Sequence, residues 1–244
     1  MYFSPYPLAE AFAVALSLGL VAYFTGTVSL SGLSGGAAIG GAIYYFGGWQ
    51  SFAVLVSFFV LGSALTKLGY ERKKEFGAAQ EAGGRRGARH AFANCAAGLL
   101  ISVVYKYSGY NPLAGTALVA SFATAAADTA ATEAGSAFGR NAFLPTTFRK
   151  VAPGTPGAVS LVGTAASLMA AVLIALVGWL VGLAPTVALA VVAASSAFLA
   201  AFTESLLGAV PAVEQALGNE GMNLLNTFWG AALCLILAAL IGQS

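Results

Sequence analysis

The fold class of this chain is decided by residues 158–203, AVSLVGTAASLMAAVLIALVGWLVGLAPTVALAVVAASSAFLAAFT, a run of 46 residues without Asp, Glu, Lys or Arg. One helical crossing of a bilayer takes about 20 predominantly apolar residues, so this run is long enough for two. Turn residues at Gly182–Pro185 divide it near its middle. The run therefore predicts two membrane-spanning helices joined by a short turn.

The rest of the chain has the same character. Of its 244 residues, 59% are hydrophobic and only 8% are charged, whereas a soluble domain has about a quarter of its residues charged. Turn signals at Thr25–Thr27 and Gly47–Gln50 divide the charge-free run 11–66 into three short spans, although two longer spans are an alternative. The pattern predicts an all-α polytopic membrane bundle, a single domain over residues 1–244. Its roughly 7–8 transmembrane helices are expected near 8–27, 30–47, 50–67, 90–107, 112–134, 158–182, 185–207 and 222–242.

Basic residues gather on one side of the predicted bundle. Seven of the eleven Lys and Arg lie in the loop 67–89 and three in the loop 138–157, whereas the other side has only Lys106. Cytoplasmic loops carry the excess of basic residues in membrane proteins. We therefore expect both loops to face the cytoplasm of a prokaryotic cell, and the polar residues near them to form a site on that face.

Several other classes of protein are excluded by composition. The net charge of +2, without a basic arm or zinc-finger spacing, argues against nucleic-acid binding. Cys95 and Cys234 lie in separate apolar segments and suggest no disulfide framework. His90 is the only histidine, so a His-based catalytic triad cannot be built. Gly32, Gly36 and Gly40 have the small-xxx-small spacing that is typical of close helix packing.

Three acidic residues are candidates for chemistry. Asp128 and Glu133 end an otherwise apolar span, and Glu204 ends the long charge-free run. Acids within membrane helices usually serve function, although a helix-end acid wetted by the interface is the alternative. On a continuous helix Asp128 and Glu133 point roughly 140° apart and do not share a face. Thr132 lies four residues after Asp128, and Thr129 lies four residues before Glu133. Each threonine therefore shares a helix face with its acid and could hydrogen-bond to it.

A second candidate is the loop 144–157, LPTTFRKVAPGTPG, which precedes a predicted helix. Backbone N–H groups at a helix N-terminus bind anions, and Arg149 and Lys150 add positive charge. A plain turn explains the same residues equally well. The basic residues of 67–89 could likewise attract phosphate, or they could only anchor the topology. For Asn94 and Asn223, substrate contact and interhelical hydrogen bonding both remain open.

The strings ADTAATEAGS (127–136), PTTFRKVAPGTPGAVSLVGTAAS (145–167) and ESLLGA (204–209) carry a family likeness. With them the chain resembles, over nearly its whole length, the domain-of-unknown-function-92 or transmembrane protein 19 family, which includes plant and cyanobacterial phytyl-phosphate kinases. The family usually has Asp where this chain has Glu204, and a longer carboxylate can still hold magnesium.

The resemblance implies a membrane prenyl-phosphate kinase. Such an enzyme transfers a phosphoryl group from a nucleoside triphosphate, expected to be CTP, to an isoprenoid monophosphate such as phytyl, geranylgeranyl or farnesyl phosphate. One or two Mg²⁺ ions would be held by Asp128, Glu133 and Glu204, with Arg149 and Lys150 as further catalytic residues. Substrate and nucleotide contacts are expected from Lys67, Arg72, Lys73, Lys74, Arg89, Asn94, Thr129, Thr132, Arg140, Thr146, Thr147, Gly154, Thr155, Gly157 and Asn223.

Two other functions are compatible with the residues alone. A transporter or lipid flippase would place its coupling charges near the bilayer midplane, between inverted repeats. A non-catalytic scaffold would use the carboxylates only to pair with the basic loops. Glycine- and alanine-rich helices also permit a homodimer.

Overall fold

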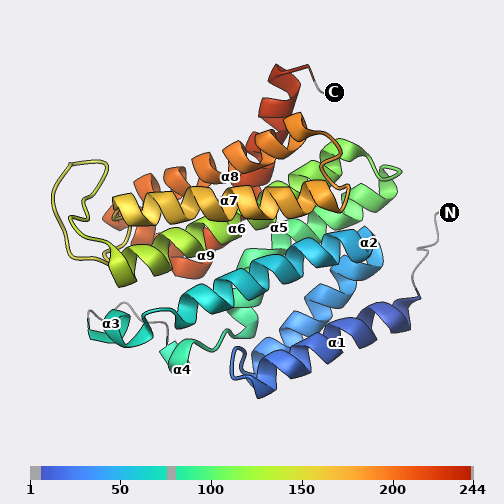
Figure 1. The fold of residues 1–244 in the computed structure, drawn as a ribbon, viewed down its shortest axis with the longest axis horizontal. Coiled ribbons are helices and arrows are strands. Elements are labelled where there is room, and N and C mark those ends of the chain that lie inside the picture. Colours follow the sequence, from blue (N-terminus) through green and yellow to red (C-terminus); the bar gives the residue numbers. More distant parts are fainter. Residues whose placement is uncertain (1–6, 76–80, 243–244) are drawn as a thin grey trace.

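The computed structural model describes residues 7–75 and 81–242, which form a bundle of helices (Figure 1). Within these residues there are isolated β-bridges but no strand, so the predicted all-α class is confirmed. The helices are α1 (Leu8–Phe24), α2 (Leu30–Lys67), α3 (Tyr70–Glu75), α4 (Glu81–Gly84), α5 (Ala88–Tyr107), α6 (Pro112–Phe138), α7 (Leu161–Leu180), α8 (Val187–Gly208) and α9 (Pro211–Leu240).

Helix α2 is broken at Gly48, where φ is +77°. Glycine adopts this left-handed conformation without the steric cost that other residues have. The two halves of α2 consequently fold back beside each other as a hairpin (Figure 1). The expected division of 11–66 into three helical segments is therefore confirmed, because α1 and the two halves of α2 supply them.

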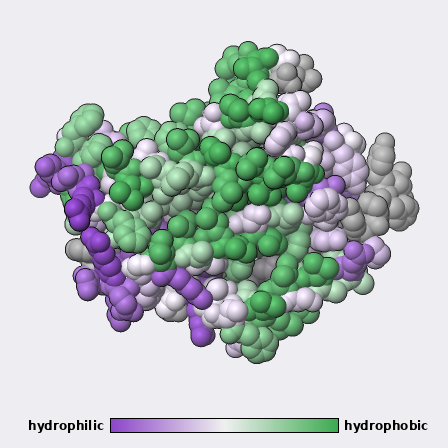
Figure 2. Space-filling model, viewed as in Figure 1, coloured by the Kyte–Doolittle hydropathy of each residue, from purple (hydrophilic) through white to green (hydrophobic). Residues whose placement is uncertain are grey.

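The bundle has the dimensions and surface of an integral membrane protein. Helices α2, α6, α7, α8 and α9 are long and apolar enough to cross a membrane, and α1 is a shorter apolar helix. Hydrophobic side chains cover much of the face in Figure 2, and a large hydrophilic patch lies at the end of the bundle that bears α3 and α4.

Helix α6 lies at the centre and is packed against α2, α5, α7, α8 and α9. Its Ala-, Gly-, Ser- and Thr-rich sequence lets the neighbouring backbones approach closely. The approach is closest at glycines of those neighbours: a Cβ on Gly230 of α9 would lie 1.9 Å from Thr124 Oγ1, and one on Gly98 of α5 would lie 2.4 Å from Phe122. These contacts hold α6, which carries two of the three candidate acids, in a fixed place.

The basic loop 67–89 contains two short helices, α3 and α4, which the sequence analysis did not predict. Its residues 76–80 lie outside the described part. The loop shares one end of the bundle with the connection 139–160, the end of α8 and the start of α9. Lys106 lies at the end of α5 that leads away from this loop, with Nζ 4.2 Å from the centroid of the Tyr45 ring.

Candidate active site

A cavity of 240 Å³ opens where α6, α8, the start of α9 and the connection 139–160 meet. Six of the predicted site residues line it: Asp128, Thr132, Gly154, Thr155, Gly157 and Glu204. These six residues come from three separate parts of the chain, α6, the connection 139–160 and α8, and the start of α9 completes the lining of the cavity at the polar end of the bundle. This convergence of the carboxylates with the Gly-Thr-Pro-Gly segment agrees with the one-sided site expected from the sequence.

Asp128 and Glu204 both line this cavity, close enough for the two carboxyl groups to affect each other electrostatically. Asn226 of α9 donates a hydrogen bond from Nδ2 to Glu204 Oε2 and so fixes the longer carboxylate. Two carboxylates at this range repel each other unless a proton or a cation lies between them. Asn226 Oδ1 is buried and has no partner among the described residues, and Asn226 lines a different cavity together with Glu204.

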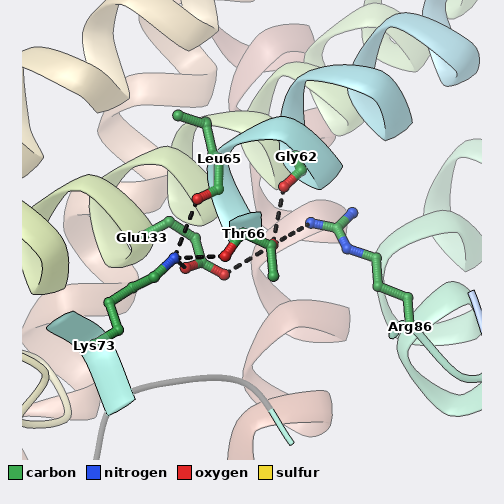
Figure 3. A network of polar contacts seen from close by, with 6 residues as sticks. All are labelled: Gly62, Leu65, Thr66, Lys73, Arg86 and Glu133. Atoms are coloured by element: carbon green, nitrogen blue, oxygen red, sulfur yellow. Dashed lines mark hydrogen bonds and ion pairs between the residues drawn. The ribbon is translucent and has the colours of Figure 1, made fainter. Parts of the chain in front are cut away.

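Glu133 does not join these two acids. Its Oε2 lies 2.5 Å from Lys73 Nζ of α3, and its Oε1 lies 2.9 Å from Thr66 Oγ1 of α2 (Figure 3). Its hydroxyl partner is therefore Thr66 and not the predicted Thr129, which is buried. No group of three His, Cys, Asp or Glu side chains suited to a metal ion occurs in residues 7–75 and 81–242.

Lys73 is fully buried and has all three ammonium donors in use. Besides Glu133, it donates to Leu65 O at 3.1 Å and to Thr66 O at 2.7 Å. These carbonyls belong to the last turn of α2, where a cation is favoured by the helix dipole. An ammonium group has three donors, so in this arrangement Lys73 has none left for the phosphate contact that the sequence suggested.

Arg86 is a buried basic residue beside the Thr66–Glu133 contact that the sequence analysis did not single out. Its side chain is 5% exposed, its Nη2 donates to Thr66 Oγ1 at 3.4 Å, and its guanidinium lies 5.8 Å from the Phe58 ring centroid. Nε has no partner among the described residues. Burial lowers the pKa of Arg86 to about 10, although nearby Glu133 acts in the opposite direction. Arg86 differs from its basic neighbours only in burial, which the sequence does not show.

The connection 139–160 places its Gly-Pro segment against the end of α8. Phe143 and Val159 exchange backbone hydrogen bonds of 3.0 and 2.8 Å, which close the connection into a loop. Gly154 and Gly157 have φ of +85° and +71°. A Cβ on Gly157 would lie 2.2 Å from Ala209 N, so only glycine permits this approach.

The other predicted contacts are dispersed. Lys67 is exposed and donates from Nζ to Thr25 O at 3.1 Å. Asn94 and Asn223 are buried, and Asn94 lines a different cavity. The remaining candidates are exposed at this end of the molecule and do not line the 240 Å³ cavity: Arg72, Lys74, Arg89, Arg140, Thr146, Thr147, Arg149 and Lys150.

Fold and site together define an integral membrane helical bundle with three acids, Asp128, Glu204 and Glu214, lining a cavity at one end. The chain belongs to the family described as integral membrane protein DUF92, which matches residues 13–231. The resemblance that the sequence motifs indicated is thereby confirmed.

Three relatives illustrate the breadth of the family. The chain is 35% identical over 191 residues to the uncharacterized membrane protein sll0875 of Synechocystis sp., covering 77% of this chain and 74% of the relative. It is 33% identical over 225 residues to protein VTE6, chloroplastic, of Arabidopsis thaliana, covering 89% and 67%. It is 30% identical over 202 residues to the uncharacterized membrane protein MJ0933 of Methanocaldococcus jannaschii, covering 83% and 82%. No solved structure matches the chain.

Proposed function

We propose that this protein is a magnesium-dependent prenyl-phosphate kinase. It transfers a phosphoryl group from a nucleoside triphosphate to an isoprenoid monophosphate, and CTP is the expected donor. One observation carries the proposal: Asp128 and Glu204 line one cavity together with the Gly154–Gly157 segment. The resemblance to a family that includes phytyl-phosphate kinases supports the choice of acceptor.

The residues present fit a magnesium ion. Mg²⁺ prefers oxygen ligands and is usually held by one or two carboxylates together with substrate phosphates, so a cluster of three acids is not required. Asp128 and Glu204 supply the two carboxylates, and the amide oxygen of Asn226 lacks a partner among the described residues. When bound, the ion would neutralise charge on the donor phosphates and help to orient them.

The wall of the cavity suits the donor phosphates. Gly154, Thr155 and Gly157 bring backbone into the cavity, and Ser160, the N-cap of α7, lines it as well. The first turn of a helix attracts phosphate through its free N–H groups and the helix dipole. These groups would position the triphosphate beside the two carboxylates, and exposed Arg149 and Lys150 add positive charge to the same connection.

The chemistry needs little from the protein beyond positioning. An oxygen of the acceptor monophosphate forms a bond to the γ-phosphorus while the bond from that phosphorus to the β–γ bridging oxygen breaks, and a nucleoside diphosphate leaves. The acceptor oxygen is already anionic, so no histidine base is required. Catalysis of this kind depends mainly on in-line orientation and charge neutralisation.

The orientation of the site is part of the proposal. The basic loops 67–89 and 138–157 lie at the same end as the cavity, and excess Lys and Arg mark the cytoplasmic side of membrane proteins. The site would then face the cytoplasm, where nucleotide is available. Labelling of single-cysteine variants in intact cells tests this: a Cys at exposed Thr147 should react only after the cells are opened.

The proposal is tested by the effect of removing one carboxylate on transfer of labelled phosphate to prenyl monophosphate. Asp128→Asn keeps the size of the side chain and should abolish transfer, while the protein remains monodisperse in detergent. Unchanged transfer by Asp128→Asn would remove this residue from the proposed site.

A further inference from the structure

A second cavity, of 470 Å³, lies between α1, both halves of α2 and the start of α5. Its walls are largely apolar and include Leu18, Ile39, Phe52, Leu55 and Phe59. The lining residues of α1 and its C-cap extend from Ala15 to Thr25, which corresponds to a length of roughly 15 Å at 1.5 Å per residue. This volume lies within the range of pockets that bind small molecules.

One end of this cavity is basic. Lys67 and Arg86 line it, and no carboxylate does so among the described residues. Glu133, which approaches Arg86 through Thr66, already has Lys73 as its ion-pair partner. Arg86 is 5% exposed and its Nε lacks a hydrogen-bond partner in residues 7–75 and 81–242. A buried cation without a bonded anion is costly, which points to an anionic ligand at this end.

We infer that this cavity binds the isoprenoid monophosphate, with its phosphate on Arg86 and Lys67 and its hydrocarbon tail between α1 and α2. The guanidinium fork matches phosphate geometry, and the apolar walls match the tail. The inference rests on the proposed function and adds the location of the acceptor, which the Asp128–Glu204 cavity does not supply.

At its basic end the apolar cavity is linked to α6, although none of the described residues lines both this cavity and the carboxylate cavity. Arg86, Thr66 and Glu133 form a continuous chain of contacts from the apolar cavity to α6 (Figure 3). Thr132, the neighbour of Glu133 on α6, lines the carboxylate cavity. By contrast, a smaller apolar cavity of 140 Å³ between α8 and α9 is lined by Glu204 and by no basic residue, so an anionic head group would be repelled there.

Gly36 of α2 offers a way to fill the cavity without disturbing the fold. It lines the cavity, and a Cβ built on it would meet nothing within 4 Å. In Gly36→Leu, the leucine side chain therefore fills part of the cavity that we assign to the hydrocarbon tail. Ala38→Leu, two residues along the same helix at an exposed position, adds nearly the same bulk outside the cavity and is the matched control.

The experiment measures binding of radiolabelled geranylgeranyl monophosphate to the full chain in phosphatidylcholine nanodiscs, without nucleotide or Mg²⁺ so that no transfer occurs. We expect Arg86→Met to weaken binding about 10- to 100-fold, the range for loss of a charge-assisted hydrogen bond. We expect Gly36→Leu to weaken it at least about tenfold through lost apolar burial. Ala38→Leu should bind as the wild type does, and Arg86→Met should not change binding of the uncharged alcohol geranylgeraniol.

Competition identifies the source of the phosphate. Excess phosphatidic acid should not displace the prenyl monophosphate, and displacement by it would overturn the assignment. Inorganic phosphate shares only the contacts with Arg86 and Lys67 and should compete only at far higher concentration than the prenyl monophosphate; competition at equal concentration would overturn the assignment. Binding that is insensitive to both Arg86→Met and Gly36→Leu would overturn it too. If Arg86→Met and Gly36→Leu both keep binding and transfer, the cavity assignment is wrong but the proposed kinase function is still supported. If the wild type binds the monophosphate at Arg86 but never transfers phosphate, the kinase fails while the cavity assignment stands.

Discussion

Asp128 and Glu133 stand five residues apart on α6 and belong to two different polar clusters. Asp128 lines a cavity together with Glu204 of α8, whereas Glu133 lies 2.5 Å from Lys73 of α3. Five residues rotate a helix by roughly 140° beyond one full turn, so the two acids project from different faces. One cluster is a pair of acids open to a cavity, and the other is a buried ion pair that fastens the basic loop to the central helix.

The acid pair should be essential for transfer. Because both carboxylates are needed to hold the proposed ion on the donor phosphates, Asp128→Asn and Glu204→Gln should each lower kcat by at least about 100-fold, the scale of losing one preorganised electrostatic contact. Glu71→Gln, at an exposed acid of α3, is the control and should keep full activity. Initial rates at saturating Mg²⁺ measure the effect. Equal rates for the Glu204→Gln and Glu71→Gln proteins would contradict it.

The Lys73–Glu133 pair should matter for stability. Lys73→Met or Glu133→Leu alone leaves an unpaired buried charge, which typically costs about 3–5 kcal/mol. The double variant Lys73→Met/Glu133→Leu leaves no such charge, so it should unfold at a higher temperature than either single variant. Thermal unfolding in detergent at constant lipid content measures this. If the double variant is as unstable as the sum of the two singles, the pair is not coupled as the structure indicates.

The close approach of Gly157 to α8 gives a prediction about the phosphate loop. Gly157→Ala introduces both a strained φ and a clash with Ala209 N, and it should displace the loop and raise the KM for nucleotide. Gly109 has nearly the same φ, +72°, but open space around its missing Cβ. Gly109→Ala therefore controls for strain, which costs about 1 kcal/mol. The account is contradicted if the two variants have the same KM for nucleotide.

Arg86 should lower the free energy of unfolding of the ligand-free protein, although it strengthens binding of the prenyl monophosphate. Burial lowers its pKa to about 10, so its charged form is disfavoured in the folded protein. The resulting penalty is fully present below pH 10 and disappears only as pH rises from about 10 towards the unfolded-state value. Arg86→Met should thus unfold at a higher temperature than the wild type when no ligand is present, by an equal margin at pH 7 and pH 9. A variant that is less stable at both pH values would refute this interpretation.

The membrane fold could be predicted from the sequence because its signals are local. Absence of charge defines the spans, and Gly48 marks the break in α2. The opposed faces of Asp128 and Glu133 also follow from helix geometry alone.

The partners of these acids could not be predicted, because they depend on how distant segments pack. Lys73 is one of seven basic residues in a single loop, and only the docking of α3 against α6 buries it. Gly36 and Gly32 belong to one glycine pattern. Yet a Cβ on Gly32 would strike Arg86 O at 2.0 Å, whereas Gly36 borders a cavity. The pattern predicts close packing for both glycines, and the structure shows it for Gly32.

The most direct test of the central claim is an assay for prenyl diphosphate. Purified protein is incubated with phytyl, geranylgeranyl or farnesyl monophosphate, Mg²⁺ and each of CTP, ATP, GTP and UTP, with EDTA and Asp128→Asn as controls. The account predicts prenyl diphosphate that forms with at least one nucleotide, and that is lost in both controls. Absence of product from every combination, with protein shown to be folded and to bind the prenyl monophosphate, would contradict it.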